Sequence, residues 1–597
     1  MQKTYSLHLV GIAILALILG NLSSRDSNQN SFPGQLIIEG MIHLGDNTTP
    51  EWPEAAAKPD GLGEYSASFN DSIGGTQRAL AFTTRDAHSD WTVSINDQPI
   101  CKLKHTGEPT EFVVMVPKGI VVKGKNVLRL STPKGGDDLT FGRVTLSNEP
   151  YNDIFEIRTV NITCTDADNK PLACRVSILN RDGQRAKTHF ADESPYPTRN
   201  GVVYTDFNGV AKVHIESGEY IFTASHGPEF SIAQHKADTK SDQDYSLSFQ
   251  LKHEVDTRGW LSADTHLHTY THSGHGDAST DERIITLAGD HTEIAISTDH
   301  NKQIDYRPTM QKHKVNGEYT HIIGNEVSTD IGHFNAFPLP ADGPIPDASI
   351  TDWAELNKEI HDKGAEVVIL NHPRWPSFTK GPFGVQQLDQ QTGLFTSGID
   401  LAVDAIELIN SDDEGSPFDV SIKDWFALIN AGNHVMAAGS SDSHAVYVPT
   451  GYGRTWVKSS TDLPTQASEK SIARNIRDGH SSAALGLFGE VFINGHGSGE
   501  TVKQSDKPLT LKCRIAHASW ADVYRVDVYV NGIIVEQFNI DEHRGQAFDQ
   551  TFSLQLDAVK KDSWVVCVAY GKKPISNWWA CEHPELYFAS NPIFISK

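Results

Sequence analysis

The most informative segment of the chain runs from Trp260 to His300, and its centre reads SADTHLHTYTHSGHGDAS (residues 262–279). A short, partly apolar run at 260–264 precedes His266 and His268 and predicts a strand. Side chains two residues apart on a strand point to the same face, so both imidazoles should leave the end of this strand side by side. That spacing suits two nitrogen ligands of one cation. Taken alone, the pair is also compatible with two histidines on an exposed loop.

Around this segment, from residue 259 to 485, short apolar runs alternate with helical patterns, which predicts βα units and a parallel sheet. The expected strands are 260–266, 293–299, 320–326, 366–371, 403–409 and 434–440, and the expected helices include 280–291, 352–363 and 419–431. Thr280 or Asp281 should cap the first helix, and Gly432 should follow the end of the third.

Nearly every expected strand ends in residues that bind metals. The candidates are His266, His268, His300, Glu326, His333, His372, Asp442 and His444. In a parallel βα barrel, side chains at the C-terminal ends of the strands converge on one mouth. A single zinc takes about three protein ligands, so eight candidates indicate two or three cations. The excess of imidazoles favours zinc, manganese or iron over calcium or magnesium.

The order of these motifs carries a family resemblance. The chain shows His-x-His, Thr-Asp-His-Asn, Gly-x-Glu, Gly-His, Asn-His-Pro and Asp-Ser-His in succession. Over 259–485 this order resembles the polymerase and histidinol phosphatase (PHP) superfamily, and the layout with flanking β-sandwich modules is most similar to its carbaryl-hydrolase branch. The resemblance implies an α/β, distorted seven-stranded (β/α) barrel and metal-dependent hydrolysis, mostly of phosphate esters.

The resemblance also implies a ligand arrangement. Glu326 would bridge the metals, and His266, His268 and Asp442 would hold the first of them. A second metal would take His333 and His372, and a third would take His300 and His444. The family usually has one more ligand after the first motif, where this chain has Ser273 and Gly274. His275 is expected in its place, with Asp277 as the second choice.

Two further residues are expected to assist the reaction. Asp264 lies two residues before His266 and is expected either to orient an imidazole or to be a solvated carboxylate at the strand end. Arg374 follows His372 and is expected either to pair with a substrate phosphate or to bridge to an acid such as Glu407. His275 or His444, if not a ligand, could protonate the leaving group.

The flanking regions read as all-β modules. Residues 35–150 alternate apolar and polar residues between turns and resemble galactose-binding-like modules, which leaves both glycan contact and simple packing open. Residues 155–252 look like the small sandwich modules beside secreted carboxypeptidases. Residues 488–597 predict a C-terminal sandwich, with Asn531-Gly532 as a hairpin turn.

Charge, the N-terminal apolar run and the cysteine content limit the cellular compartments and the classes of partner that can be expected. The chain has 51 basic and 76 acidic residues, a net charge of −25, which argues against nucleic acid as a partner. The apolar run 9–19 is too short to span a bilayer comfortably and fits a secretory signal, so residues 1–24 are expected to be a signal peptide or an uncleaved N-terminal anchor. The protein is therefore expected in the periplasm or outside the cell. Six cysteines suit that setting, and Cys164 and Cys174 could pair across a hairpin.

These observations define three functional hypotheses. The first is an exported metal-dependent phosphoesterase acting on a small-molecule or oligomeric monoester or diester. The second is a carboxyl-ester or carbamate hydrolase on the same metals. The third is an inactive, glycan-binding surface protein, which the intact ligand set disfavours. An amidohydrolase would share the opening His-x-His, but it would usually end in a lone Asp, whereas this chain has Asp442-Ser443-His444.

Overall fold

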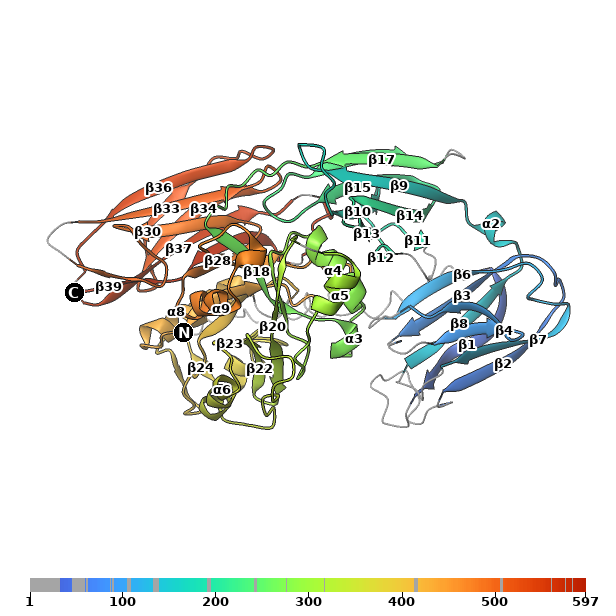
Figure 1. Cartoon of the computed structure of the whole chain (residues 1–597), viewed down its shortest axis with the longest axis horizontal. Helices are drawn as coiled ribbons and strands as arrows, with labels where there is room; N and C mark the ends of the chain where they lie inside the picture. Colours follow the sequence, from blue (N-terminus) through green and yellow to red (C-terminus); the bar gives the residue numbers. More distant parts are fainter. Residues whose placement is uncertain are drawn as a thin grey trace, which may run out of the picture.

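The computed structural model describes residues 33–597 apart from 46–59, 61–62, 86, 88–90, 105–108, 133–138, 190–194, 241–243, 275, 316, 413–416, 505–507, 560, 575 and 582. The expected signal at 1–24 lies outside the described residues. In Figure 1 the N-terminal strands (blue) lie at one end of an elongated molecule, the C-terminal strands (orange to red) lie at the other, and the α/β region lies between them. None of the helices in the described part is long and apolar enough to cross a membrane.

Two four-stranded sheets form the N-terminal sandwich. The first has the order β1 (Gly34–Leu44), β8 (Leu139–Ser147), β3 (Arg78–Arg85) and β6 (Thr110–Val116). The second has the order β2 (Glu64–Asp71), β7 (Gly124–Ser131), β4 (Thr92–Ile95) and β5 (Gln98–Lys102). Alternating apolar residues from both sheets, with Trp91 fully buried, make a core of their own.

A second pair of sheets follows the short helix α2 (Tyr151–Ile154). One sheet has the order β11 (Thr188–His189), β14 (Val210–Glu216), β9 (Ile157–Thr165) and β17 (Tyr245–Gln250), and the other has the order β12 (Thr198–Arg199), β13 (Val202–Tyr204), β10 (Arg175–Asn180), β15 (Glu219–Ser225) and β16 (Ala233–Asp238). Cys164 and Cys174, which could have paired across a hairpin, are not joined by a disulfide, and all six cysteines are buried. Burial, with Cys164 as a hydrogen-bonded neighbour, raises the pKa of the Cys174 thiol.

The largest sheet has eleven strands and joins the α/β region to the C-terminal module. Its main path has the order β20 (Thr320–Ile323), β19 (Ile294–Ser297), β18 (Trp260–Leu267), β28 (Gly453–Lys458), β29 (Ser481–Leu485), β38 (Glu585–Ser590), β37 (Ser563–Lys572), β34 (Asp522–Val530) and β35 (Ile533–Asn539), with β39 (Ile593–Ser596) and β32 (Thr501–Lys503) beside it. β29 pairs with β38 through Ala483 and Ala589. The expected boundary at 485–488 therefore does not separate two sheets.

A five-stranded sheet faces this one across the α/β region. Its order is β21 (Asn325–Thr329), β22 (Gly332–Phe337), β23 (Val367–Leu370), β26 (Ala405–Asn410) and β27 (Met436–Ser440). Residues of both sheets, such as Ile296 and Ile369, share one buried cluster. The prediction of a closed barrel is wrong. Among the described strands, β22 and β28 run antiparallel to their neighbours, and the strands form two separate hydrogen-bonded sheets.

The helices lie between the strands much as expected. They are α3 (Tyr270–Ser273), α4 (Thr280–Gly289), α5 (Arg307–Lys312), α6 (Trp353–Asp362), α7 (Pro382–Val385), α8 (Phe418–Asn430), the short 3₁₀ helix η1 (Pro464–Gln466) and α9 (Glu469–Arg477). The cap of α4 is Ser279, not Thr280 or Asp281, and it forms a capping box with Glu282. Gly432 follows the end of α8 with a φ of +97°, as expected.

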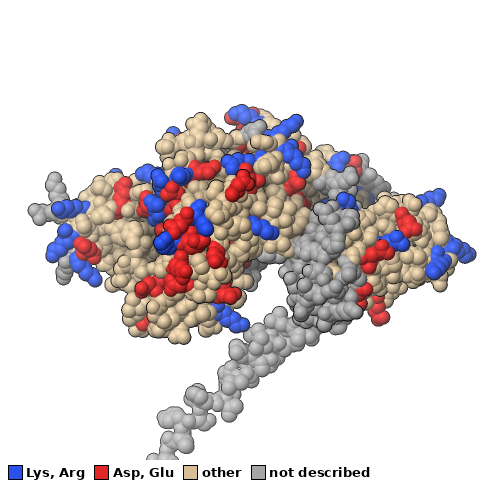
Figure 2. Space-filling model, turned by 60° about the horizontal axis from the view of Figure 1, so that its bottom comes forward, with Lys and Arg blue, Asp and Glu red and all other residues tan. Residues whose placement is uncertain are grey.

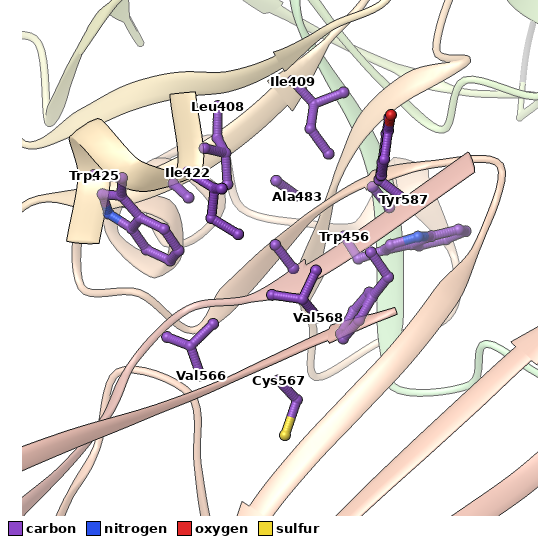
Figure 3. Packing of buried hydrophobic residues seen from close by; sticks show 14 of the residues in the cluster. Leu408, Ile409, Ile422, Trp425, Trp456, Ala483, Val566, Cys567, Val568 and Tyr587 are labelled. Carbon is purple, nitrogen blue, oxygen red and sulfur yellow. The ribbon is translucent and has the colours of Figure 1, made fainter. Parts of the chain in front are cut away.

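The C-terminal module packs directly on the α/β region. Its second sheet has the order β31 (His496–Gly497), β30 (Phe488–Ile493), β33 (Leu509–His517) and β36 (Phe548–Leu556), and a separate two-stranded hairpin comprises β24 (Leu388–Asp389) and β25 (Leu394–Phe395). Figure 3 shows Leu408 of β26 and Trp425 of α8 in the same cluster as Val566 and Val568 of β37. On the face shown in Figure 2, acidic and basic side chains are interspersed rather than separated.

Candidate metal centre

The structure brings the expected metal ligands to one end of the two facing sheets. His266 is the next-to-last residue of β18, and Glu326 and His333 are the second residues of β21 and β22, respectively. The other candidates follow strand ends, namely His268, His300, His372, Asp442 and His444. At this end the two sheets meet through isolated parallel bridges, Leu267 to Ser443 and His300 to Glu326. Convergence therefore arises from the meeting of two sheet edges rather than from a closed barrel.

The ligand atoms gather into overlapping groups of three. Within each group they all lie within 4.8 Å of one another, and the groups are His266, His268 and Asp442; His266, Glu326 and His372; His300, Glu326 and His333; and His268, His300 and His444. Glu326 belongs to two groups, as a bridging carboxylate would. These buried groups could hold metal ions. The first group contains the same three residues as the first expected metal site.

The separations between atoms match those of atoms bound to a shared cation. Nε2 of His266 and Nε2 of His268 each lie 3.2 Å from Oδ1 of Asp442. Nε2 of His266 also lies 3.2 Å from Oε1 of Glu326. Two ligands about 2.1 Å from one ion at a tetrahedral angle are about 3.4 Å apart. Oδ1 of Asp442 is buried and accepts no hydrogen bond from the described residues, which leaves it available to a cation.

Burial and neighbouring charges act on these groups in opposite directions. Burial alone would lower the pKa of His266, but Asp442, Glu326 and Glu407 raise it well above its ordinary value. Burial, helped by the neighbouring His444, lowers the pKa of His268 well below its ordinary value. Burial raises the pKa of Asp442 to about 6. A bound cation would relieve the cost of burying this carboxylate in its charged form.

Glu407 of β26 supports the centre and was not among the expected ligands. Its Oε1 lies 2.9 Å from Nδ1 of His266, and its Oε2 accepts a hydrogen bond of 2.7 Å from the backbone N–H of His372. Asn410 and Ser440 also donate to it. One carboxylate thus positions two candidate ligands. The sequence signal for it is a single acid inside an otherwise apolar strand, AIELIN.

A second chain of hydrogen bonds supports His268. Its Nδ1 lies 3.0 Å from Oγ of Ser273, and that hydroxyl donates to Oδ1 of Asp299 at 2.8 Å. Asp299 also accepts a hydrogen bond from the backbone N–H of Thr269 at 2.8 Å and one from the Tyr306 hydroxyl at 3.0 Å. Ser273 therefore orients a candidate ligand where a further ligand was expected.

The backbone at two ligands is in an uncommon conformation. His372 has a φ of 26° and Asp442 a φ of 55°, both in the left-handed region that non-glycine residues seldom adopt. The N–H of Asp442 donates to the carbonyl of His266 at 3.0 Å, which helps to hold this turn. Such conformations persist where the surroundings impose them and are concentrated at functional sites.

Asp264 is neither solvated nor hydrogen-bonded to an imidazole, although its Oδ1 accepts a hydrogen bond of 3.3 Å from the backbone N–H of His266. The carboxylate is buried, and it accepts hydrogen bonds from the Ser441 N–H at 3.0 Å, the Ser441 hydroxyl at 2.6 Å and the Gly451 N–H at 2.7 Å. It contacts no imidazole through these bonds. Asp264 instead fixes the turn after β27 that carries Asp442.

Of the two roles expected for Arg374, the structure shows a salt bridge to an acid rather than a side chain open to substrate. Its guanidinium is buried and donates to both carboxylate oxygens of Asp424 in α8, at 2.7 and 2.8 Å. The acid is Asp424 rather than Glu407, the example expected from the sequence. Asp277 likewise lies outside the metal groups, because its carboxylate lies 3.2 Å from Nε of Arg199 and accepts a bond from the Val446 N–H at 2.7 Å. His275 lies outside the described residues.

Comparisons with known proteins add little to this geometry. No protein-family model matches the chain, and no curated protein matches it. Among solved structures, an FMN-binding β-glucuronidase from Facaelibacterium prausnitzii L2-6 is 12% identical over 95% of this chain and 98% of that chain, with a TM-score of 0.18. A Bacteroides uniformis β-glucuronidase is 8% identical over 94% and 80%, with a TM-score of 0.17. The Bacillus anthracis TIE protein is 9% identical over 42% of this chain and 46% of its own length, with a TM-score of 0.13.

Proposed function

We propose that the protein is an exported, metal-dependent hydrolase of ester bonds, with phosphate esters as the favoured substrates. The observation that carries this proposal is the meeting of imidazoles and carboxylates from six strand ends at ligand-like separations, such as 3.2 Å from Asp442 Oδ1 to both His266 and His268. The order of motifs that resembles the PHP superfamily supports the same reaction class. The proposed export depends on the apolar run at 9–19.

The residues of the chain would act by holding and orienting. Bound divalent cations would supply a water of lowered pKa and would polarise the ester oxygen. Glu407 would hold the imidazole of His266 in the orientation that binds a cation, and Ser273 would do the same for the imidazole of His268. If two cations bind and His444 is not a ligand, this residue, whose Nδ1 lies 2.8 Å from the Asp442 carbonyl, would pass a proton to the leaving group.

A phosphoester is favoured because two or three clustered cations suit the in-line displacement at phosphorus. A carboxyl ester or carbamate is the second candidate. One observation favours it: Arg374, the arginine expected to grip a phosphate, is fully engaged with Asp424. In either reaction, the charge that develops on the ester would be stabilised by the cations and the imidazoles.

The test begins with metal analysis of the purified protein. Turnover of nitrophenyl phosphate, bis-nitrophenyl phosphate and nitrophenyl acetate is then compared. The double variant His266→Ala/His268→Ala should lose bound metal. Its activity should fall by more than about 100-fold, which is the upper end of the loss expected when only a residue supporting a metal ligand is changed. The exposed His235→Ala in β16 is the control. Turnover of the acetate alone would favour the second candidate, and metal-free protein with unchanged activity would exclude both.

A further inference from the structure

A small pocket opens beside the metal centre. It has a volume of about 150 Å³, and two candidate ligands, His333 and His372, form one side of it. The remaining walls are mostly apolar, with Ile331, Trp375 and Val385 among them, and Asp330 and Lys380 add one charge of each sign. A concave, mostly apolar site that adjoins a few convergent polar groups is the usual form of a small-molecule binding site.

Trp375 is the most prominent wall of this pocket. Its side chain is 47% exposed, although a tryptophan is usually well covered. Its ring centroid lies 5.2 Å from that of His372, and its backbone N–H donates to the His372 carbonyl at 2.9 Å. Val385, across the pocket, is 58% exposed. Two large apolar side chains are thus left open to solvent directly beside a polar centre, where an apolar group of a ligand would cover them.

The walls are held in place from behind. Arg374, next to Trp375, is anchored by Asp424 and also donates to the Phe378 carbonyl at 3.0 Å. Gly332, with a φ of +131°, lies where an added Cβ would be 3.0 Å from Cγ of Pro382. A side chain at 332 would therefore press on the pocket wall. The pocket is preformed, so that a ligand would meet little ordering cost.

The size of the pocket limits what it can take. An apolar cavity of about 150 Å³ is large enough for one benzene ring. We propose that this pocket binds a single ring-sized apolar group of the ester substrate, such as a monocyclic phenol, next to the bond that is cleaved. This inference rests on the proposed hydrolase function, because it takes the neighbouring histidines as the reacting centre.

The test measures binding without turnover. Phenylphosphonate, methylphosphonate and naphthylphosphonate are titrated by calorimetry into the metal-loaded protein. Phenylphosphonate should bind roughly tenfold or more tightly than methylphosphonate, because the ring is buried. Naphthylphosphonate should gain nothing further, because a second fused ring exceeds the pocket. Trp375→Ala should remove the preference for phenyl, and Trp375→Phe should keep most of it.

Controls separate the pocket from the reaction and from folding. Leu394→Ala, which removes an apolar side chain that is 61% exposed and not part of the pocket, should leave the preference unchanged. Val385→Ala gives a second, milder change at the pocket should Trp375→Ala fail to fold. If phenylphosphonate binds more tightly than methylphosphonate in a Trp375-dependent way but no ester is hydrolysed, the proposed function is rejected and the proposed ring-binding pocket is supported. Equal affinity for phenylphosphonate and methylphosphonate would contradict the proposal that the pocket binds a ring, even in an active hydrolase. A preference for phenylphosphonate that persists in both Trp375→Ala and Val385→Ala would contradict it as well.

Discussion

Glu407 and Asp442 lie in the same cluster, yet their surroundings set them apart. Burial would raise the pKa of both carboxyls, but His266, His372 and the Ser440 hydroxyl hold that of Glu407 down, at about 2. Burial raises the pKa of Asp442 to about 6, because the lowering effect of His266 and His372 is opposed by the nearby carboxylates of Glu326 and Glu407. Glu407 is therefore a satisfied, charged support, whereas Asp442 is a ligand that gains most from a cation.

Replacing Glu407 tests its supporting role. Glu407→Gln should keep the fold but lower metal affinity by about 10- to 100-fold, because His266 and His372 lose the carboxylate that positions both. Affinity is measured by competition with a chelator of known strength. Glu355→Gln, on the exposed side of α6, is the matched control. An affinity within twofold of the parent protein would show that Glu407 does not position the ligands.

His321 gives a pH dependence that is independent of the metals. Its Nε2 accepts a hydrogen bond from the Tyr306 N–H at 3.1 Å, so the ring must be neutral, and burial lowers its pKa to about 4. The unfolded chain protonates this group near pH 6.5, so its stabilising contribution is present above that pH and is lost as pH falls toward 4, by about 3 kcal/mol in total.

Denaturant unfolding at a series of pH values measures this loss. In His321→Gln the free energy of unfolding should fall less steeply between pH 6.5 and 4, by up to about 1.4 kcal/mol per pH unit. His226 and His517, whose pKa values burial lowers to about 3 and about 4, should account for part of the remaining slope. Identical slopes in the parent and the variant would contradict the assignment of His321 as a buried neutral group.

At the scale of residues, the sequence allowed the ligands to be predicted better than their partners. His266 lies near the end of a strand, and His372 and Asp442 follow the ends of two others, where the side chains of neighbouring parallel strands meet. The partner of Arg374 is Asp424, fifty residues away on α8, and no local pattern indicates which acid a folded arginine will meet. The same is true of Asp264, whose donors come from the turn after β27.

Among the elements, the segment 372–385 depends on helix α8 for its shape. The buried pair between Arg374 and Asp424 ties the segment that carries Trp375 to that helix. Arg374→Met or Asp424→Leu should each lower the free energy of unfolding by about 3–5 kcal/mol, because each leaves a buried charge without its partner. The double variant should lose much less than the sum of the two.

Urea unfolding of the parent, both single variants and the double variant gives the coupling free energy between the two side chains. The single variants should also weaken phenylphosphonate binding, because Trp375 is no longer held. Additive losses, with a coupling near zero, would mean that the pair does not hold the segment in place.

The positions of the strands and helices agree closely with those predicted from the sequence, whereas the pairing of the strands does not. The expected strand 366–371 is β23, and the expected helix 352–363 is α6, within a residue at each end. β28 and β22 were not anticipated, and both pair antiparallel to their neighbours. Local alternation shows that a segment is a strand, but the direction of its neighbour depends on contacts far away in the chain. The expectation of a closed parallel barrel failed for this reason.

Across the whole molecule, the region of the metal centre and the C-terminal module share one sheet and one hydrophobic core. β29 continues into β38, and apolar residues from both regions share one core. Asn591, fully buried between β38 and β39, accepts a hydrogen bond from the Ala437 N–H at 2.7 Å and donates to the Ala437 and Ser481 carbonyls at 3.1 and 3.0 Å. It joins the C-terminal strands to both facing sheets. The N-terminal sandwich, in contrast, has its own separate core.

This division predicts two kinds of thermal transition. Calorimetry with saturating metal and with chelator should show one transition that rises with metal and includes residues 259–597, because a ligand stabilises only the unit whose unfolding releases it. At a free metal concentration of 100 times Kd the gain is about 2.7 kcal/mol. The transition of the N-terminal sandwich should not move.

Asn591→Ala assigns these transitions. It leaves the buried Ala437 N–H and two carbonyls without partners, which should lower the metal-sensitive transition by about 3 kcal/mol or more and leave the other unchanged. Asn475→Ala in α9 is a milder control, because this half-buried side chain donates one hydrogen bond near the surface, to the Lys458 carbonyl. If the C-terminal module instead unfolded in a transition that neither metal nor Asn591→Ala affects, the shared sheet would not couple it to the centre. Support of the ligand-bearing strands would then have to come from the facing five-stranded sheet alone.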